Sequence, residues 1–277
     1  MKFATDSYYH IGSTHLNSGK PCQDYALSGL REGAAYAVVA DGCSSGGHTD
    51  VGARLLTLSV AQAIHEHREI LTHSKVMMSG LREILGLSWH DMLATCLYAR
   101  VTPDDSFVLA YGDGIIAHKE VGGKIYLSQL EWMDNRPFYS AYSGEHLLNF
   151  IQDHGGDVNA KRLLLKKWEY IPNNGFHHIA DQEFTLGEGM EGIRVHLEEL
   201  EEIDCIAIFS DGAAEIDGLD WKEAVVQLLA FKTVEGEFAK RRMMRVIKDA
   251  QKNGRGPMDD IAYAVIRIIK RDEGAEV

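Results

Sequence analysis

Apolar residues along the chain gather in short runs that predict β-strands. Runs of this length bounded by turn residues are typical of strands. Pro103-Asp104-Asp105 and Gly122-Gly123 separate successive runs and predict hairpin turns, so we expect mostly antiparallel sheets. The runs assigned to strands are residues 35–40, 94–101, 107–111, 115–118, 124–127, 205–209 and 261–269.

Four other segments carry patterns typical of helices. In residues 51–69, Thr49 or Asp50 would cap the start, and the apolar positions recur at helical spacing. Those positions are Val51, Leu55, Leu58, Ala61 and Ile64. The other predicted helices cover residues 75–92, 221–231 and 238–251, the last stopped by Asn253-Gly254. Two long helices followed by a hairpin do not fit repeated βαβ units, so we expect an α+β fold with helices packed outside the sheets.

Residues 131–191 are the least regular part of the chain. They mix aromatic, basic and glycine-rich pieces, with a helix predicted over residues 160–168. Two basic pairs, Lys161-Arg162 and Lys166-Lys167, would form a solvated face of that helix or attract phosphopeptides. We interpret residues 1–277 as a single domain in which residues 131–191 form a variable flap or insertion over the functional site.

The composition is that of a globular protein with an excess of acid. Of the 277 residues, 45% are apolar and 25% charged, which argues against collagen, coiled coil and disorder. Asp and Glu outnumber Lys and Arg by 41 to 28, and the formal charge is −13. Such a chain repels phosphate backbones, so we expect no nucleic-acid partner. The same charge suits a protein that collects cations.

The cysteines and the hydropathy indicate the cellular location of the protein. None of the four cysteines forms a CxxC pair, which argues against a disulfide framework or a zinc site. Cys96 and Cys205 lie in apolar runs and are expected to be buried. No secretory signal opens the sequence, and no apolar stretch approaches the length that spans a membrane. We therefore expect a cytoplasmic protein that does not bind membranes.

Carboxylates recur where the apolar runs stop. Asp41, Asp113 and Asp211 each end a run and precede glycine, Asp259 comes just before the last run, and Asp24 precedes Tyr25-Ala26-Leu27. Strand ends can converge at one rim of a sheet, where such acids repel one another unless something neutralises them. Oxygen ligands without cysteine or clustered histidine suit Mg²⁺ or Mn²⁺. Two such ions can hold a nucleophilic water against a phosphate.

With these acids in this order, the chain resembles the metal-dependent serine/threonine phosphatases of type 2C. The resemblance covers nearly the whole chain and rests on Gln23-Asp24, Asp41-Gly42 with the following Ser-Ser-Gly-Gly, Gly112-Asp113-Gly114, Ser210-Asp211-Gly212 and Asp259-Asp260. It implies a four-layer α-β-β-α sandwich, with two central antiparallel sheets and helices on both outer faces. It also implies two Mn²⁺ or Mg²⁺ ions in a cleft at one end, with a weaker third.

The resemblance assigns a role to each acid. Asp41 corresponds to the carboxylate that bridges both metals, and Gly42 to the residue whose carbonyl binds the second metal. Asp24 corresponds to the other acid near that second metal. Asp24 and Asp113, taken singly, also fit plain turn residues.

The remaining acids complete the implied set. Asp211 and Asp259 correspond to the ligands of the first metal, and Asp113 to the acid of the third. Asp260 is assigned a supporting role beside Asp259. A water between the two main ions would be deprotonated and attack phosphorus in line.

The sequence departs from the family in the residues that meet the substrate. The family usually has an arginine about five residues before the first acid, where this chain has Gly19. His15 is our candidate for the phosphate-facing role, with Lys20 as another nearby basic residue, and a surface histidine is the alternative for His15. Some members have a histidine after the first Asp-Gly, where this chain has Cys43. His48 would then return a proton to the leaving group, unless it is a solvated loop residue.

The leading hypothesis is therefore an enzyme, a metal-dependent protein-serine/threonine phosphatase with Asp41, Asp211, His15 and His48 as catalytic residues. One alternative is a phosphatase-like regulatory or binding module without turnover, and another is a phosphohydrolase of small molecules. Expected partners are a phosphorylated protein substrate and an opposing Ser/Thr kinase, and the protein is expected to be a monomer.

Overall fold

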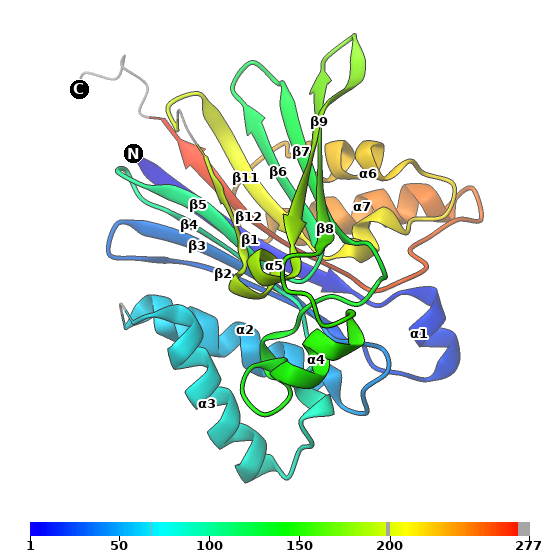
Figure 1. Cartoon of the computed structure of the whole chain (residues 1–277). Coiled ribbons are helices and arrows are strands. Elements are labelled where there is room, and N and C mark those ends of the chain that lie inside the picture. The colour runs from blue at the N-terminus through cyan, green and yellow to red at the C-terminus, as the bar shows by residue number, and fades with distance from the viewer. Residues whose placement is uncertain (67, 198–199, 271–277) are drawn as a thin grey trace.

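The computed structural model describes residues 1–66, 68–197 and 200–270, which form two antiparallel sheets (Figure 1). The seven-stranded sheet has the order β1 (Lys2–His10), β12 (Ile261–Ile269), β11 (Ile203–Phe209), β6 (Gly114–Glu120), β7 (Ile125–Trp132), β8 (Lys161–Ile171) and β9 (Gly175–Thr185). The five-stranded sheet has the order β10 (Ile193–His196), β5 (Ser106–Tyr111), β4 (Cys96–Val101), β3 (Ala34–Asp41) and β2 (Asp24–Arg31).

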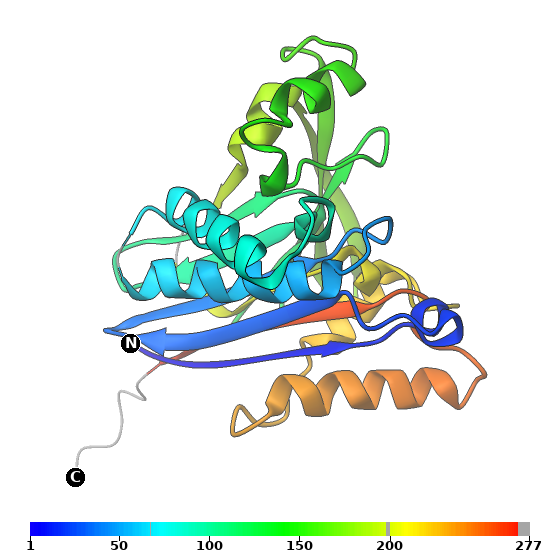
Figure 2. The same cartoon turned by 90° about the horizontal axis from the view of Figure 1, so that it is seen from below.

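Helices cover the outer faces of both sheets (Figure 2). α2 (Thr49–His65) packs on β2 and β3, and α3 (Ile70–Leu85) packs on α2. α6 (Trp221–Leu228) and α7 (Phe238–Gln251) pack on the seven-stranded sheet. This arrangement confirms the predicted α+β sandwich. The shorter elements are α1 (Ser13–Ser18), α4 (Leu147–Asp153), α5 (Leu186–Glu191) and three 3₁₀ turns, η1 (His90–Met92), η2 (Ser140–Tyr142) and η3 (Asp211–Ala214).

The central strands are buried on both faces. Ile206 and Ile208 of β11 belong to the apolar core between the sheets, whereas Cys205, Ala207 and Phe209 pack under α6 and α7. Successive side chains of a strand point to opposite faces, so a strand covered on both sides must be apolar throughout. This burial explains why the sequence shows continuous apolar runs. Cys96 and Cys205 are buried free cysteines, as predicted.

All seven predicted strands are present, and the four helices predicted outside residues 131–191 are present with shifted ends. The predicted face of α2 is partly wrong, since Leu58 is 50% exposed while Ala53, Leu56 and Val60 are buried. The predicted helix over residues 75–92 divides into α3, which ends at Leu85, and the separate turn η1.

The helix predicted over residues 160–168 is wrong, because these residues form most of β8. Leu163 and Leu165 are buried at alternate positions, and the strand pairs with β7 on one side and β9 on the other. Two partner strands outweigh the helical propensity of a Leu- and Lys-rich segment. The solvated helix face is therefore also wrong, and Lys166 pairs with Glu131 at 2.6 Å.

The described part of the chain contains no helix that is both long and apolar enough to cross a membrane.

Candidate metal centre

Asp24 and Asp41 lie directly opposite each other in the five-stranded sheet. Asp24 begins β2, Asp41 ends β3, and the two residues are register partners. Asp24 is only 2% exposed, and its Oδ2 meets no hydrogen-bond donor in the described part of the chain. Burial raises the pKa of Asp24, while the neighbouring Asp41 carboxyl and Ser210 hydroxyl act less strongly to lower it. A buried carboxylate oxygen without a donor costs free energy unless a cation or proton meets it.

The seven-stranded sheet brings further acids to the same rim. Asp211 follows β11 as the first residue of η3, and it lies close enough to Asp41 for the two carboxyls to affect each other's pKa. Asp259, just before β12, acts electrostatically on Asp211. Asp113, in the turn between β5 and β6, interacts in the same way with Asp211 and Asp41. The structure thus gathers all five predicted carboxylates where the ends of the two sheets meet.

Close backbone approach explains the glycines beside these acids. A Cβ at residue 42 would lie 2.7 Å from the carbonyl oxygen of Thr49, and one at residue 212 would lie 1.8 Å from that of Asp260. Both distances are below normal contact, so a larger residue would push apart the segments that carry Asp41, Asp211 and Asp260. The Asp-Gly pairs in the sequence therefore reflect packing of the rim as well as turn formation.

Burial and mutual repulsion disfavour negative charge in this cluster. Burial, then repulsion from Asp24 and Asp211, raises the pKa of Asp41 well above its usual value. Burial also raises the pKa of Asp24 and that of Asp211, where Asp259 adds repulsion. Burial and the charge of Asp211 raise the pKa of Asp113 to about 7. A bound divalent cation would reverse this balance, because it stabilises the ionised carboxylates.

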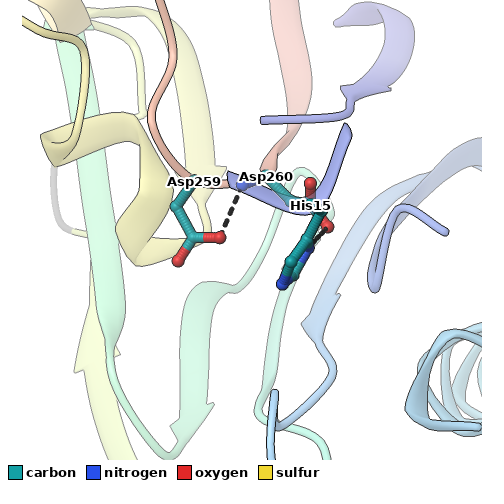
Figure 3. A group of neighbouring side chains, drawn as sticks. All are labelled: His15, Asp259 and Asp260. Atoms are coloured by element: carbon teal, nitrogen blue, oxygen red, sulfur yellow. Dashed lines mark hydrogen bonds and ion pairs between the residues drawn. The ribbon is translucent and has the colours of Figure 1, made fainter. Parts of the chain in front are cut away.

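His15 lies next to the acids that precede β12. Its Nδ1 is 2.7 Å from Oδ2 of Asp260, and its side chain is only 8% exposed, so the surface-histidine alternative is wrong. Potential ligand atoms of His15, Asp259 and Asp260 lie within 4.8 Å of one another. Figure 3 shows the His15 ring and the Asp259 carboxylate extending on the same side of the backbone. A carboxylate at Nδ1 fixes the ring orientation and directs Nε2 away from Asp260.

Asp260 is engaged by the protein itself. The backbone N–H of Gly12 donates to its Oδ1 at 2.7 Å, and the backbone N–H of Gln23 donates to its Oδ2 at 2.6 Å. Together with His15 these bonds occupy both carboxylate oxygens. Asp259 uses one oxygen to accept the N–H of Asp260 at 2.8 Å and is more exposed. Asp260 therefore fits a supporting role, and Asp259 is the more available ligand.

His48 and Cys43 lie on the loop between Asp41 and α2. His48 is exposed; its backbone N–H donates to Oδ1 of Asp91 at 2.8 Å, while its ring makes no hydrogen bond to a described residue. Cys43 lies 3.0 Å from the hydroxyl of Ser45. No contact in the described part of the chain joins the His48 ring to the carboxylates, so the structure does not bring His48 into the cluster.

Tyr139 is a residue of the centre that the sequence analysis missed. It is buried, and it lies close enough to Cys43 for the two side chains to interact electrostatically. Burial and the nearby Cys43 raise the pKa of Tyr139, and the charges of Asp113 and Asp41 act in the same direction. No motif marks this residue, because its approach to the rim depends on the path of residues 133–146.

A hollow of about 280 Å³ opens beside the carboxylate cluster. Asp113 and Asp211 line it together with Glu131, Glu215 and Asn135. Oxygen ligands of this kind are those that Mg²⁺ and Mn²⁺ prefer, and the donorless Oδ2 of Asp24 is the atom that such an ion would satisfy. The residues present therefore fit divalent cations.

Comparisons with known proteins agree with this fold. The sequence matches the protein family described as protein phosphatase 2C over residues 11–250. The structure resembles the serine/threonine phosphatase PstP/Ppp of Mycobacterium tuberculosis, with a TM-score of 0.54 and 13% identity over 98% of this chain and 100% of that one. It also resembles the phosphatase Stp1 of Staphylococcus aureus, with a TM-score of 0.54 and 12% identity over 98% and 96% of the two chains. No curated protein sequence matches the chain.

Proposed function

The chain belongs to the protein phosphatase 2C family, and on that basis we propose that it hydrolyses phosphoserine and phosphothreonine in proteins with the help of divalent cations. The observation that supports this proposal is the convergence of five carboxylates at one rim. They come from both sheets, and one of them carries a buried oxygen that meets no donor.

The proposed centre holds two Mn²⁺ or Mg²⁺ ions and a weaker third. Asp41 lies between Asp24 and Asp211 and would bridge the two main sites. Asp259 would join Asp211 at one site, the Gly42 carbonyl would join Asp24 at the other, and Asp113 would hold the third ion. When bound, such ions neutralise the carboxylates, polarise a phosphoryl oxygen and lower the pKa of water enough for in-line attack on phosphorus.

His15 would take the place of the arginine that the family usually carries. The Asp260 carboxylate orients its ring, so that in the imidazolium form Nε2 can donate a hydrogen bond to a substrate phosphoryl oxygen. His48, exposed on the loop after Gly42, would return a proton to the leaving hydroxyl. Asp41 and Asp211 would contribute to catalysis as ligands that hold the metal ions in place.

The family and the hollow at the rim support the substrate class that we propose. A phosphorylated side chain can enter the hollow beside Asp113 while the rest of the protein stays outside. The natural partner activity is a Ser/Thr kinase that adds the phosphoryl group. We treat residues 1–277 as one catalytic domain that acts as a monomer in the cytoplasm.

Hydrolysis assays test this function. Wild-type protein and Asp211→Asn would be assayed on p-nitrophenyl phosphate and a phosphothreonine peptide, with Mn²⁺, Mg²⁺ or EDTA. We expect cation-dependent turnover of both compounds, preference for the peptide, and loss of both activities in the variant. Preference for small phosphate esters would instead support a small-molecule phosphohydrolase. A folded wild-type protein without turnover under any metal would support a regulatory module.

A further inference from the structure

A groove of about 430 Å³ runs between α3 and residues 140–146, apart from the carboxylate cluster. One wall is α3, and the other is formed by residues 140–146, with Trp89 and Met92 between them. None of the candidate metal ligands lines it. It is larger than the hollow beside Asp113.

Residues beside the groove touch the loop that follows Asp41. Asp91, two residues after Trp89, accepts the backbone N–H of His48 at 2.8 Å. Tyr139, which precedes the segment 140–146, lies close enough to Cys43 for the two side chains to interact electrostatically. A protein whose phosphorylated side chain reaches the carboxylate rim would therefore place its neighbouring residues near this groove.

The charges along the groove suit an acidic segment. Lys75 and Arg82 both line it, and neither makes an ion pair with a described residue. Glu145 is the one acid among the lining residues. Lys75 and Arg82 therefore give the lining a net positive charge in a chain with 41 acidic and 28 basic residues. Because they are seven residues apart on one helix, the two side chains share a face and start about 10 Å apart along the axis.

The groove also offers apolar contact between those charges. Val76 is 68% exposed, and the buried Met78 also lines the groove. Trp89 stacks on His146 with ring centroids 3.9 Å apart and planes 17° apart, which joins the two walls. A peptide in the polyproline II conformation advances about 3.1 Å per residue with three residues per turn, so side chains three residues apart share a face and lie about 9 Å apart.

We propose that this groove binds the polypeptide beside the phosphorylated residue of the substrate protein. The segment it fits has the polyproline II conformation, with two acidic side chains three residues apart that pair with Lys75 and Arg82, and an apolar side chain between them that packs on Val76 and Trp89. This inference rests on the proposed phosphatase function, since the phosphoryl group must occupy the carboxylate rim at the same time.

The test compares two phosphothreonine peptide sets with p-nitrophenyl phosphate, which has no chain to reach the groove. One set carries Glu-Leu-Ala-Glu at different distances on either side of phosphothreonine, and the other carries Gln-Ala-Ala-Gln at the same places. We expect kcat/KM for the best acidic peptide to exceed that of its matched neutral peptide about tenfold. In Val76→Glu and in Arg82→Glu, the ratio of kcat/KM for that peptide to kcat/KM for p-nitrophenyl phosphate should fall about tenfold.

Ile84→Glu is the matched control, because Ile84 is 80% exposed on the same helix and does not line the groove. That variant should keep the wild-type ratio. A double variant, Lys75→Glu with Arg82→Glu, should prefer a peptide with lysine in place of both glutamates. Equal use of acidic and neutral peptides by wild type, or an equal fall of the ratio in Ile84→Glu, would overturn the proposal.

A binding measurement separates this proposal from the phosphatase function. Fluorescence anisotropy in EDTA would follow a labelled, unphosphorylated Glu-Leu-Ala-Glu peptide, for which no catalysis is needed. Binding that Arg82→Glu weakens about tenfold and Ile84→Glu leaves unchanged would support the groove. Its absence in a protein that hydrolyses p-nitrophenyl phosphate would reject the groove alone. A protein that binds the peptide but hydrolyses nothing would instead contradict the proposed function, and with it the assignment of the peptide as substrate.

Discussion

Nδ1 of His15 lies 2.7 Å from Oδ2 of Asp260, although 245 positions separate the two residues in the chain. The contact joins α1 to the strand end that carries Asp259, and two backbone N–H groups hold Asp260 in place. A histidine oriented in this way has one free nitrogen, which is directed away from its carboxylate.

If His15 contacts the substrate phosphoryl group, its replacement should weaken substrate binding. We expect His15→Gln to raise KM for p-nitrophenyl phosphate about tenfold or more, since hydrogen bonds to charged groups contribute about 1.5–3 kcal/mol. Asp260→Asn should raise KM in the same direction by releasing the ring. Lys20→Gln is the control, because the Lys20 ammonium instead bonds the Ser44 carbonyl at 3.0 Å. A rise in KM for Lys20→Gln but not for His15→Gln would contradict the assignment.

The buried carboxyl of Asp24 should make stability depend on divalent cations. In Asp24→Asn, the metal-free protein should unfold at a temperature a few degrees higher than wild type, because the variant removes a charge whose ionisation burial disfavours. Addition of Mn²⁺ should then raise its melting temperature less than that of wild type, since one ligand is lost. Thermal unfolding in EDTA and in Mn²⁺ measures both effects. Asp104→Asn, in the exposed β4–β5 turn, should change neither. A full Mn²⁺ response in Asp24→Asn would exclude Asp24 as a ligand.

His118 should make the protein less stable in mild acid. Burial, with a smaller contribution from Lys124, lowers the pKa of His118 to about 4 from 6.5. Because the folded pKa is the lower one, its stabilising contribution is complete above pH 6.5 and is lost as the pH falls towards 4. At pH 5 the loss amounts to about 2 kcal/mol of the free energy of unfolding.

His118→Phe keeps a ring to stack on Tyr126, which His118 does with centroids 4.6 Å apart, but it cannot take up a proton. Urea unfolding at pH 7 and pH 5 would give the free energy of unfolding of both proteins. We expect wild type to lose about 2 kcal/mol more than the variant between these pH values. Equal losses would show that His118 is not buried as a neutral ring.

The start of α7 depends on a side chain from another element. Oδ2 of Asp6, on β1, accepts the backbone N–H of Ala239 at 2.6 Å, whereas the residue before the helix, Glu237, makes no side-chain cap. Asp6→Ala should therefore lower the free energy of unfolding by about 1 kcal/mol, as the loss of a cap does. Asp6→Asn keeps an acceptor oxygen and should lose less. Urea unfolding would measure the free energy of unfolding of both variants. Equal losses would show that the hydrogen bond to the Ala239 N–H is not what makes Asp6 stabilising.

The strands that carry the acids could be predicted because their signal is local. Residues 35–40 and 205–209 are apolar throughout and are each followed by Asp-Gly, directly in one case and after a serine in the other. The runs are apolar throughout because these strands are buried on both faces. Glycine follows each aspartate because the backbone packs closely at the rim. Both therefore appear in the sequence itself.

The features that the sequence does not predict depend on contacts between residues far apart in the chain. β8 has the composition of a helix and becomes a strand because β7 and β9 pair with it. The burial of His15 depends on Asp260, and the approach of Tyr139 to Cys43 depends on the path of the intervening chain. The groove beside α3 likewise joins residues about 60 positions apart, so no short motif predicts it.

The number of divalent ions bound per chain tests the central claim most directly. Isothermal titration of chelator-treated protein with Mn²⁺ should give two ions bound per wild-type chain, with a weaker third at high concentration. Asp41→Asn should lose both main sites, because Asp41 lies between Asp24 and Asp211. A folded wild-type protein that binds no Mn²⁺, or an Asp41→Asn variant that binds as many ions as wild type, would contradict the account.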